Sequence, residues 1–310
     1  MENVIVTGGA GFIGSHLCES LLSKYKVICI DDLSSGKREN IEDIDKNLEF
    51  IQHNVIEPLN FDIGEISYIF HLASRASPID YGKFPVHTLR TNSEGTYNML
   101  ELARKKDAKF LFASTSEIYG NPLEHPQKET YFGNVNPIGV RACYDEGKRF
   151  GETITSTYVR EYGLDARIVR IFNTYGPKMR PDDGRVVSNF IVQALRNEPL
   201  TVYGDGSQTR SFCYISDMVE GIKKALFTKN SRGKVINLGN PNEFTIIELA
   251  KIVKKLSNSG SEIVFRELPE DDPQRRKPDI TLAIKLLNWR PMVDLKDGLR
   301  RTIEYFSTIL

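Results

Sequence analysis

The feature that most constrains this chain is a glycine-rich turn that joins an apolar strand to an amphipathic helix. Residues 4–7 are VIVT, and the segment GGAGFIG follows at 8–14. Apolar residues then recur at Ile13, Leu17 and Leu21, a spacing typical of a helix that buries one face. A strand, a tight turn and a helix in this order predict the first unit of a parallel sheet covered by helices.

The same alternation continues through the first half of the chain. It predicts further strands at 26–31, 48–52, 66–72, 109–113 and 166–172, and helices at 12–23, 86–104 and 142–162. After Gly176-Pro177 the pattern loosens into short strands near 200–203 and 235–238 and separate helices. We therefore expect a Rossmann-type, doubly wound α/β domain over 1–175 and a smaller domain over 176–310. The two should be partly interleaved, because a late strand can return to the sheet.

Composition excludes a disordered, a collagen-like and a coiled-coil protein. The 310 residues carry 41 Lys and Arg against 41 Asp and Glu, and 40% are hydrophobic, which is typical of a globular chain with a sizeable core. This charge balance gives no reason to expect nucleic acid or a membrane as a partner. No basic leader and no apolar run of ~18 residues is visible, so we expect a cytoplasmic protein.

The cysteines and histidines indicate neither a disulfide framework nor a metal site. The four cysteines are scattered without a CxxC pair, and the five histidines include no HExxH spacing. We expect mostly buried thiols and chemistry that uses no metal.

Three glycines of the turn have the spacing of a dinucleotide-binding loop. Gly8, Gly11 and Gly14 would let backbone N–H groups and the helix N-terminus face a pyrophosphate. Such a turn can also be purely structural, but Asp31 ends the next strand, where a carboxylate can accept hydrogen bonds from a ribose. Because that carboxylate would repel a 2′-phosphate, the sequence favours NAD over NADP.

A tyrosine and a lysine four residues apart form a second group. Tyr144 and Lys148 share one face of the helix predicted at 142–162, so the ammonium can favour ionisation of the phenol. Lowering a phenol pKa from ~10 to near 7 takes ~4 kcal/mol, within reach of a lysine plus a nicotinamide cation in a dry cleft. Tyr144 could then act as a base on a sugar hydroxyl. Without the glycine turn, a surface tyrosine packed on a lysine would be the better interpretation.

Polar residues follow the strand at 109–113, at the edge where open parallel sheets bind ligands. Thr115 could donate to an oxygen that becomes a carbonyl, and Glu117 would add a carboxylate nearby. On local sequence alone, Glu117 could equally be a solvent-exposed acid.

Together these groups resemble an extended short-chain dehydrogenase/reductase of the nucleotide-sugar type. Longer motifs resemble, within it, the UDP-glucuronate decarboxylase (UDP-xylose synthase) family: ASRASP at 73–78, TSE at 115–117, NPIGVRACYDEGKR at 136–149, DGRVVSNFI at 183–191 and DPQRRKPD at 272–279. The resemblance runs nearly end to end. Two positions depart from the pattern, since Arg75 stands where the family usually has proline and Asn54 where it usually has aspartate.

The resemblance implies a set of binding residues. Asn54 and Val55 follow a strand where such folds contact adenine, and an amide oxygen can still accept from the adenine amino group. Further cofactor contacts are implied for Phe12, Ile13, Asp32, Leu33, Ser35, Gly36, Leu72, Ser74, Thr91, Ala113 and Thr174. Substrate contacts are implied for Arg90, Asn98, Tyr158, Asn173, Arg185, Asn189, Arg210 and Arg276.

The resemblance also implies a reaction, the decarboxylation of UDP-glucuronate to UDP-xylose with NAD regenerated in each cycle. Oxidation at sugar carbon 4 places a ketone β to the carboxylate, carbon dioxide leaves, and the hydride returns. Tyr144 would be the base and Thr115 an oxyanion donor, while Lys148 would orient the cofactor ribose. Glu117 and Arg276 would position the ring and the carboxylate.

Other functions stay open. A 4,6-dehydratase would carry Asp-Glu after the threonine, where this chain has Ser116, and a 4-epimerase generally lacks the acid at Glu117. A non-catalytic NAD-binding regulator is expected to lack the tyrosine and lysine. The resemblance further implies a homodimer that pairs the helices at 86–104 and 142–162, with Phe150, Ile154 and Tyr158 as weak apolar support.

Overall fold

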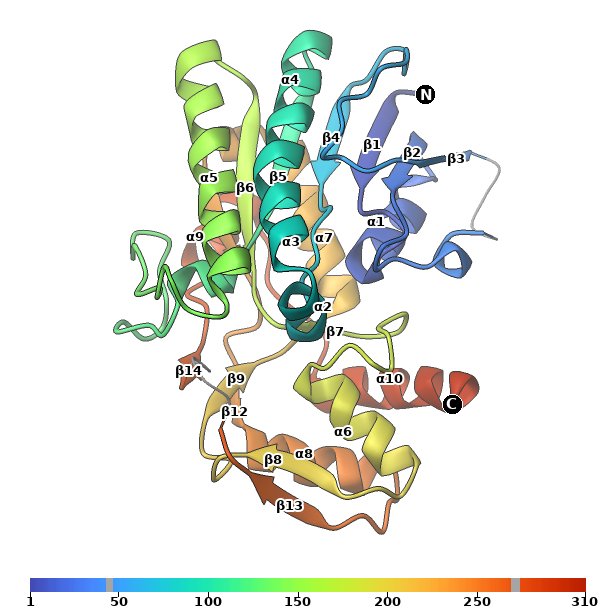
Figure 1. Cartoon of the computed structure of the whole chain (residues 1–310), viewed down its shortest axis with the longest axis vertical. Helices are drawn as coiled ribbons and strands as arrows, with labels where there is room; N and C mark the ends of the chain where they lie inside the picture. The colour runs from blue at the N-terminus through green and yellow to red at the C-terminus, as the bar shows by residue number, and fades with distance from the viewer. Residues whose placement is uncertain (43–46, 269–273) are drawn as a thin grey trace.

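A parallel sheet forms the centre of the computed structural model, which describes residues 1–42, 47–268 and 274–310 (Figure 1). Within the described residues the sheet has seven strands, in the order β11 (Val235–Leu238), β6 (Ala166–Ile171), β5 (Lys109–Thr115), β4 (Tyr68–His71), β1 (Asn3–Thr7), β2 (Lys26–Asp31) and β3 (Leu48–Gln52). Neighbouring strands are parallel throughout. The Rossmann-type fold expected from the sequence is confirmed.

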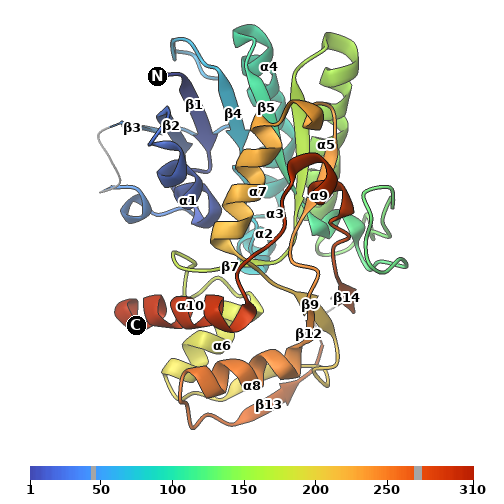
Figure 2. The ribbon, with the colours of Figure 1, turned by 180° about the vertical axis from the view of Figure 1, so that it is seen from behind.

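Helices cover both faces of this sheet (Figures 1 and 2). On one face lie α3 (Pro85–Arg90), α4 (Thr96–Lys106) and α5 (Ala142–Tyr162), and on the other lie α1 (Phe12–Leu21), α7 (Ile215–Phe227) and α9 (Thr281–Leu287). The apolar stripe of the first helix is directed inward, since Leu17 and Leu21 are buried. A sheet buried on both faces explains why its strands read as continuous β-branched and aromatic runs.

The smaller part of the chain lies beyond the carboxyl ends of the strands (Figure 1). It contains α6 (Val186–Leu195), α8 (Ile246–Leu256), α10 (Leu295–Ile309) and the parallel pair β8 (Leu200–Tyr203) and β13 (Ile263–Arg266). Short strands connect it to the sheet: β7 (Thr174–Tyr175), β9 (Thr209–Ser211), β10 (Cys213–Tyr214), β12 (Glu243–Thr245) and β14 (Arg275–Arg276). Strand β11, which follows residue 175 in the chain, returns to pair with β6 in the sheet. The domain boundary at residue 175 therefore stays a prediction.

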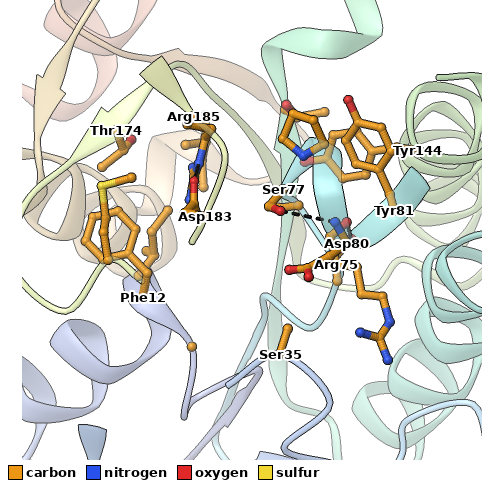
Figure 3. Close-up of a pocket in the computed structure, with 18 of the residues that line it drawn as sticks. Phe12, Ser35, Arg75, Ser77, Asp80, Tyr81, Tyr144, Thr174, Asp183 and Arg185 are labelled. Carbon is orange, nitrogen blue, oxygen red and sulfur yellow. Dashed lines mark hydrogen bonds and ion pairs between the residues drawn. The ribbon is translucent and has the colours of Figure 1, made fainter. Parts of the chain in front are cut away.

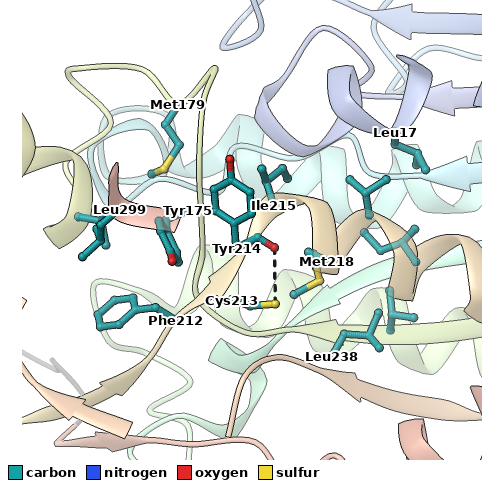
Figure 4. Close-up of a cluster of buried hydrophobic side chains, with 14 of the residues drawn as sticks. Leu17, Tyr175, Met179, Phe212, Cys213, Tyr214, Ile215, Met218, Leu238 and Leu299 are labelled. Atoms are coloured by element: carbon teal, nitrogen blue, oxygen red, sulfur yellow. Dashed lines mark hydrogen bonds between the residues drawn. The ribbon is translucent and has the colours of Figure 1, made fainter. Parts of the chain in front are cut away.

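One hydrophobic cluster runs from the sheet into the smaller part (Figure 4). It includes Leu17 of α1, Met218 of α7, Tyr175 and Phe212 of the connecting segments, and Leu299 of α10. All five are at most 3% exposed. Packing is therefore continuous between the two parts of the chain. It holds the two sides of the cleft between them in fixed positions.

The helix expected at 86–104 is interrupted. A π-helical turn, Thr91–Gly95, separates α3 from α4. In this turn Thr91 Oγ1 and Asn92 Nδ2 donate to the carbonyls four residues earlier, and a Cβ at Gly95 would lie 2.7 Å from Val55 Cγ2. Side-chain bonds to the backbone and a close packing contact favour such a bulge over regular helix. Other boundaries differ by one or two residues: α1 ends at Leu21, β4 begins at Tyr68 and β5 extends to Thr115.

The described residues carry no helix that is long and apolar enough to cross a membrane, and no cluster of His, Cys, Asp and Glu that could hold a metal ion. All four cysteines are free thiols.

Candidate active site

A cleft between the carboxyl ends of the strands and the smaller part collects most of the residues expected in a site. Figure 3 shows its two walls, with Phe12, Thr174 and Arg185 on one side and Tyr81 and Tyr144 on the other. The sequence-predicted residues that line the cleft are Gly8, Gly11, Phe12, Ile13, Gly14, Asp31, Asp32, Ser35, Asn54, Val55, Leu72, Ser74, Thr91, Ala113, Thr115, Glu117, Tyr144, Lys148, Asn173, Thr174, Arg185, Asn189 and Arg210.

The glycine turn leaves no space for side chains. Gly8 has φ +70°, and a Cβ at Gly14 would lie 2.0 Å from the Gly8 carbonyl oxygen. Helix α1 starts at Phe12 without a side-chain cap on its first N–H groups. The turn and the helix N-terminus therefore form a cradle that a pyrophosphate can enter.

Asp31 ties this cradle to the loop that follows β2. Its carboxylate accepts from Ala10 N at 3.0 Å and from Leu33 N at 2.8 Å. Burial raises its pKa, and the two backbone donors oppose that rise. Leu33 and Gly36 flank the carboxylate, since a Cβ at Gly36 would lie 3.0 Å from both of its oxygens. Such an arrangement fits the ribose of a dinucleotide.

Asn54, one of the two departures from the family pattern, contacts a histidine on α3. The Asn54 amide lies 3.2 Å from His87 Nε2, and its oxygen accepts from Ile56 N at 3.0 Å. Asp32 lies 3.9 Å from the same histidine ring. Burial and Arg75 lower the pKa of His87, and a neutral imidazole suits an amide partner as well as an acid.

Tyr144 lies against two cleft residues rather than beside a cation. Its ring stacks on Tyr81 at a centroid distance of 5.1 Å, and its hydroxyl is hydrogen-bonded to Thr115. Burial raises the pKa of Tyr144, and Thr115 and Arg185 only partly offset it. Desolvation of the phenolate is the largest effect on this pKa, so the lowering expected with a lysine and a nicotinamide cation in the cleft stays a prediction.

Lys148 is directed to the backbone of β5. Its Nζ donates to the Ala113 carbonyl at 2.8 Å and lies 5.0 Å from the centre of the Phe112 ring. The lysine is 3% exposed, and burial lowers its pKa to about 7. Helical spacing predicts that the Lys148 ammonium lies beside the Tyr144 hydroxyl, but in the structure it binds the Ala113 carbonyl instead.

Glu117 is held by two guanidinium groups. Its Oε2 accepts from Arg141 and from Arg276 Nη2, the latter at 3.3 Å, and Arg276 Nη1 also donates to the Ser116 carbonyl. Burial would raise the pKa of Glu117, but Arg276, Arg141 and Arg210 outweigh it and lower the pKa to about 2. Glu117 is thus a fixed carboxylate, not a solvent-exposed acid.

The sequence predicts that Arg276 binds substrate, but in the structure it does not line the cleft. It is 1% exposed and lies behind Glu117. A buried guanidinium needs an anionic partner, and Glu117 supplies it. The motif around Arg276 is described from Gln274 onward, and its first two residues, Asp272 and Pro273, lie outside the described residues.

Three residues expected to bind substrate lie away from the cleft. Arg90 pairs with Glu94 on the surface of the helical layer, Asn98 donates to the carbonyls of Val55 and Ile56, and Tyr158 donates to Glu101 at 2.6 Å. Each contact joins α3, α4 or α5 to its surroundings, so the structure does not bring these three residues to the cleft, and their substrate contacts stay predictions. The place of these residues depends on which side of each helix faces the cleft, and a single sequence does not show this.

Two residues that line the cleft were not predicted from the sequence, Tyr81 and Arg141. Tyr81 stacks on Tyr144, and Arg141 lies 5.9 Å from the centre of the Tyr81 ring while binding Glu117. They connect the two candidate catalytic groups. Both contacts are tertiary, and no local spacing reveals them.

Comparison with family models and curated proteins places the chain. The model described as "NAD dependent epimerase/dehydratase family" matches residues 4–239. The chain is 54% identical over 306 residues to UDP-glucuronic acid decarboxylase 2 of Arabidopsis thaliana, covering 98% of this chain and 68% of that protein. It is 52% identical to UDP-glucuronic acid decarboxylase 1 of Xenopus tropicalis, over 98% and 72% of the two chains.

Solved structures agree on the fold, and the match extends over entire chains. UDP-glucose 4-epimerase of Thermotoga maritima superposes with a TM-score of 0.91 at 32% identity, covering 99% of both chains. UDP-glucuronic acid 4-epimerase of Bacillus cereus, in complex with UDP-glucuronic acid and NAD, gives 0.90 at 31% identity, over 99% and 100%. The chain therefore belongs to the NAD dependent epimerase/dehydratase family of extended short-chain dehydrogenase/reductases, as a relative of the UDP-glucuronic acid decarboxylases.

Proposed function

We propose that the chain converts UDP-glucuronate to UDP-xylose and carbon dioxide, with NAD as a cofactor regenerated in each cycle. The observation that carries this is the carboxylate of Glu117, held by Arg141 and Arg276 next to Thr115 in the cleft. The decarboxylases at 52% to 54% identity over 98% of the chain support the same reaction.

NAD fits the cradle on grounds of space and charge. The glycine turn would hold its pyrophosphate, Asp31 its ribose, and Asn54 and Val55 its adenine. Bound there, NAD supplies oxidation and later re-reduction at sugar carbon 4. Oxidation at that carbon leaves a ketone β to the carboxylate, so the C–C bond electrons can pass into an enolate as carbon dioxide leaves.

The residues of the chain hold and move protons around this carbon. Tyr144 exchanges the proton of the 4-hydroxyl, and Thr115, hydrogen-bonded to it, stabilises the oxygen while it bears charge. Lys148, fixed on Ala113, orients the cofactor ribose. Glu117 orients the sugar ring. Arg276 is a positioning residue, because it acts through Glu117.

Arginines of the smaller part suit the UDP group. Arg185 lines the cleft beside Asp183, with Nη2 2.7 Å from Asp183 Oδ2, and Arg210 lines it from β9. Guanidinium groups bind diphosphate oxygens in pairs. Asn173 and Asn189 lie along the same wall.

A UDP-sugar 4-epimerase is the second candidate. The structures from Thermotoga maritima and Bacillus cereus compared above are 4-epimerases, and the second is in complex with UDP-glucuronic acid. A non-catalytic regulator is disfavoured, because it is expected to lack the tyrosine and lysine, and Tyr144 and Lys148 both line the cleft.

Product analysis tests the proposal. Given UDP-glucuronate, the purified chain should release carbon dioxide and form UDP-xylose without net NADH. Tyr144→Phe should lower turnover by ~10²–10⁴-fold and retain UDP-sugar binding, because the ring and its packing remain. Mass spectrometry separates the outcomes, since an epimerase product keeps the mass of its substrate. Interconversion of UDP-glucose and UDP-galactose, with UDP-glucuronate untouched, would establish the epimerase instead.

The chain is further proposed to act as a homodimer in the cytoplasm. Aromatic side chains of Tyr97 on α4 and Phe150 on α5 are about half exposed, and free thiols suit a reducing compartment.

A further inference from the structure

Arg75, which stands where the family usually has proline, connects two segments beside the cleft, the loop at Ser34 and the chain at Phe84. Its Nη1 donates to the Ser34 carbonyl at 2.9 Å, and its guanidinium carbon lies 4.4 Å from the centre of the Phe84 ring. The residue is 7% exposed although it lines the cleft. In Figure 3 its side chain extends away from Tyr144 and Tyr81. Its role is therefore distinct from that of the catalytic groups.

A second arginine joins the same loop to the helix that precedes Phe84. Arg180 Nη2 donates to Asp80 Oδ1 at 3.0 Å, and its Nη1 lies 3.4 Å from the Ser35 carbonyl. The Arg180 and Asp80 side chains are 19% and 15% exposed. Two guanidinium groups thus reach consecutive carbonyls of one loop, from positions 75 and 180.

The two segments that these arginines join lie where the adenosine half of NAD is expected. Ser34 and Ser35 lie in the loop that Asp31 ties to the glycine cradle. Asp80 belongs to α2 (Pro78–Lys83), and Phe84 follows it directly. Ser34, Ser35 and Asp80 all line the cleft.

We propose that Arg75 and Arg180 form a strap that slows the release of NAD and NADH by holding the loop of Ser34 and Ser35 against α2. Both contacts use charged donors, which bind more strongly than neutral ones. The inference rests on the proposed function for its purpose. A cofactor lost between oxidation and re-reduction would strand the oxidised sugar, so slow release keeps the two steps coupled.

The test measures NADH dissociation with no UDP-sugar present, by displacement with excess NAD and loss of NADH fluorescence. Arg75→Met should speed dissociation by roughly tenfold or more, the range expected for a lost charged hydrogen bond. Asp80→Asn, which removes the carboxylate on α2 that Arg180 binds and leaves its ion pair with Asp182, should speed it by a smaller factor. The double variant should be faster than either. Thermal unfolding of the NADH-free variants shows whether they fold.

Arg38→Met is the matched control. Arg38 also lies over an aromatic ring, 4.1 Å from the centre of Phe50, and follows the same loop, but it does not line the cleft. Its loss should leave the dissociation rate unchanged. Arg75→Lys keeps the charge and loses the planar fork, so it should still release NADH faster.

Two results would overturn the strap. Dissociation from Arg75→Met and Asp80→Asn at the rate of the unmodified chain would assign both residues a structural role only. Full retention by Arg75→Lys would mean that charge alone holds the cofactor. Because no sugar is present, failure of decarboxylation leaves this measurement readable, and a chain that binds no NADH would refute the strap as well.

Discussion

Lys148 shows how burial changes the chemistry of one residue. Its pKa is lowered to about 7 from 10.5, and desolvation is the main cause. Folding therefore costs free energy when the lysine is protonated. That cost is complete below pH 7, where both states are charged, and it shrinks as the pH rises toward the unfolded pKa.

Comparison with Lys148→Met tests this cost. Between about pH 7 and 10, the free energy of unfolding of the unmodified chain should rise relative to the variant by up to about 1.4 kcal/mol per pH unit. Below pH 7 the difference should be flat. Urea unfolding of both NAD-free proteins at about pH 6, 7.5 and 9 measures it. Parallel profiles across this range would contradict the lowered pKa of Lys148.

Residue by residue, local patterns predicted the cofactor side better than the catalytic network. Gly14 and Asp31 could be located because a turn and a strand end define their surroundings. The ion pair of Glu117 with Arg276 joins positions 159 residues apart. No local pattern encodes such a pair, and only the motif resemblance brought both residues into one hypothesis.

At the scale of elements, the short helix α2 has an importance that its six residues do not suggest. It begins at Pro78 after Ser77, whose side chain caps Asp80 N, and it presents Tyr81 to Tyr144. The Tyr81 hydroxyl is buried without a hydrogen-bond partner among the described residues. The ring, not the hydroxyl, is thus the part that contacts the candidate base.

Two substitutions separate these parts of Tyr81. Tyr81→Leu removes a stacking contact of about 0.5–1.5 kcal/mol, and we expect kcat to fall roughly tenfold with little change in KM. Tyr81→Phe keeps the ring and removes an unpaired hydroxyl, so it should keep kcat and stability. Steady-state kinetics on UDP-glucuronate provide the readout. Equal losses in both variants would assign the role to the hydroxyl.

Elements were predictable wherever a single period runs through them. The helix α5 and strands β2, β3 and β8 have the bounds expected from sequence. The bulge at Thr91–Gly95 was not predicted, because it depends on the close approach of Gly95 to Val55. The place of β11 beside β6 is likewise tertiary, and the sequence could only suggest that a late strand returns.

For the whole molecule, the continuous core reaches from Leu17 to Leu299, and the helices α4 and α5 present aromatic side chains on a face outside it. On that face, a groove between α4 and α5 is lined by Tyr97, Phe150 and Ile154, and the first two are 49% and 46% exposed. Exposed aromatic side chains on neighbouring helices favour association with a second copy. Tyr158, expected on this face, is instead buried against Glu101.

Light scattering at micromolar concentration should give twice the 35.2 kDa mass of the chain. Phe150→Glu should convert it to the monomer, because an interface that buries an unpaired carboxylate loses several kcal/mol, roughly. Phe265→Glu is the control, since this phenylalanine is 56% exposed on β13, in the smaller part. If the unmodified chain has the monomer mass, or if both variants dissociate alike, then α4 and α5 do not form the interface, and the exposed aromatic side chains need another explanation.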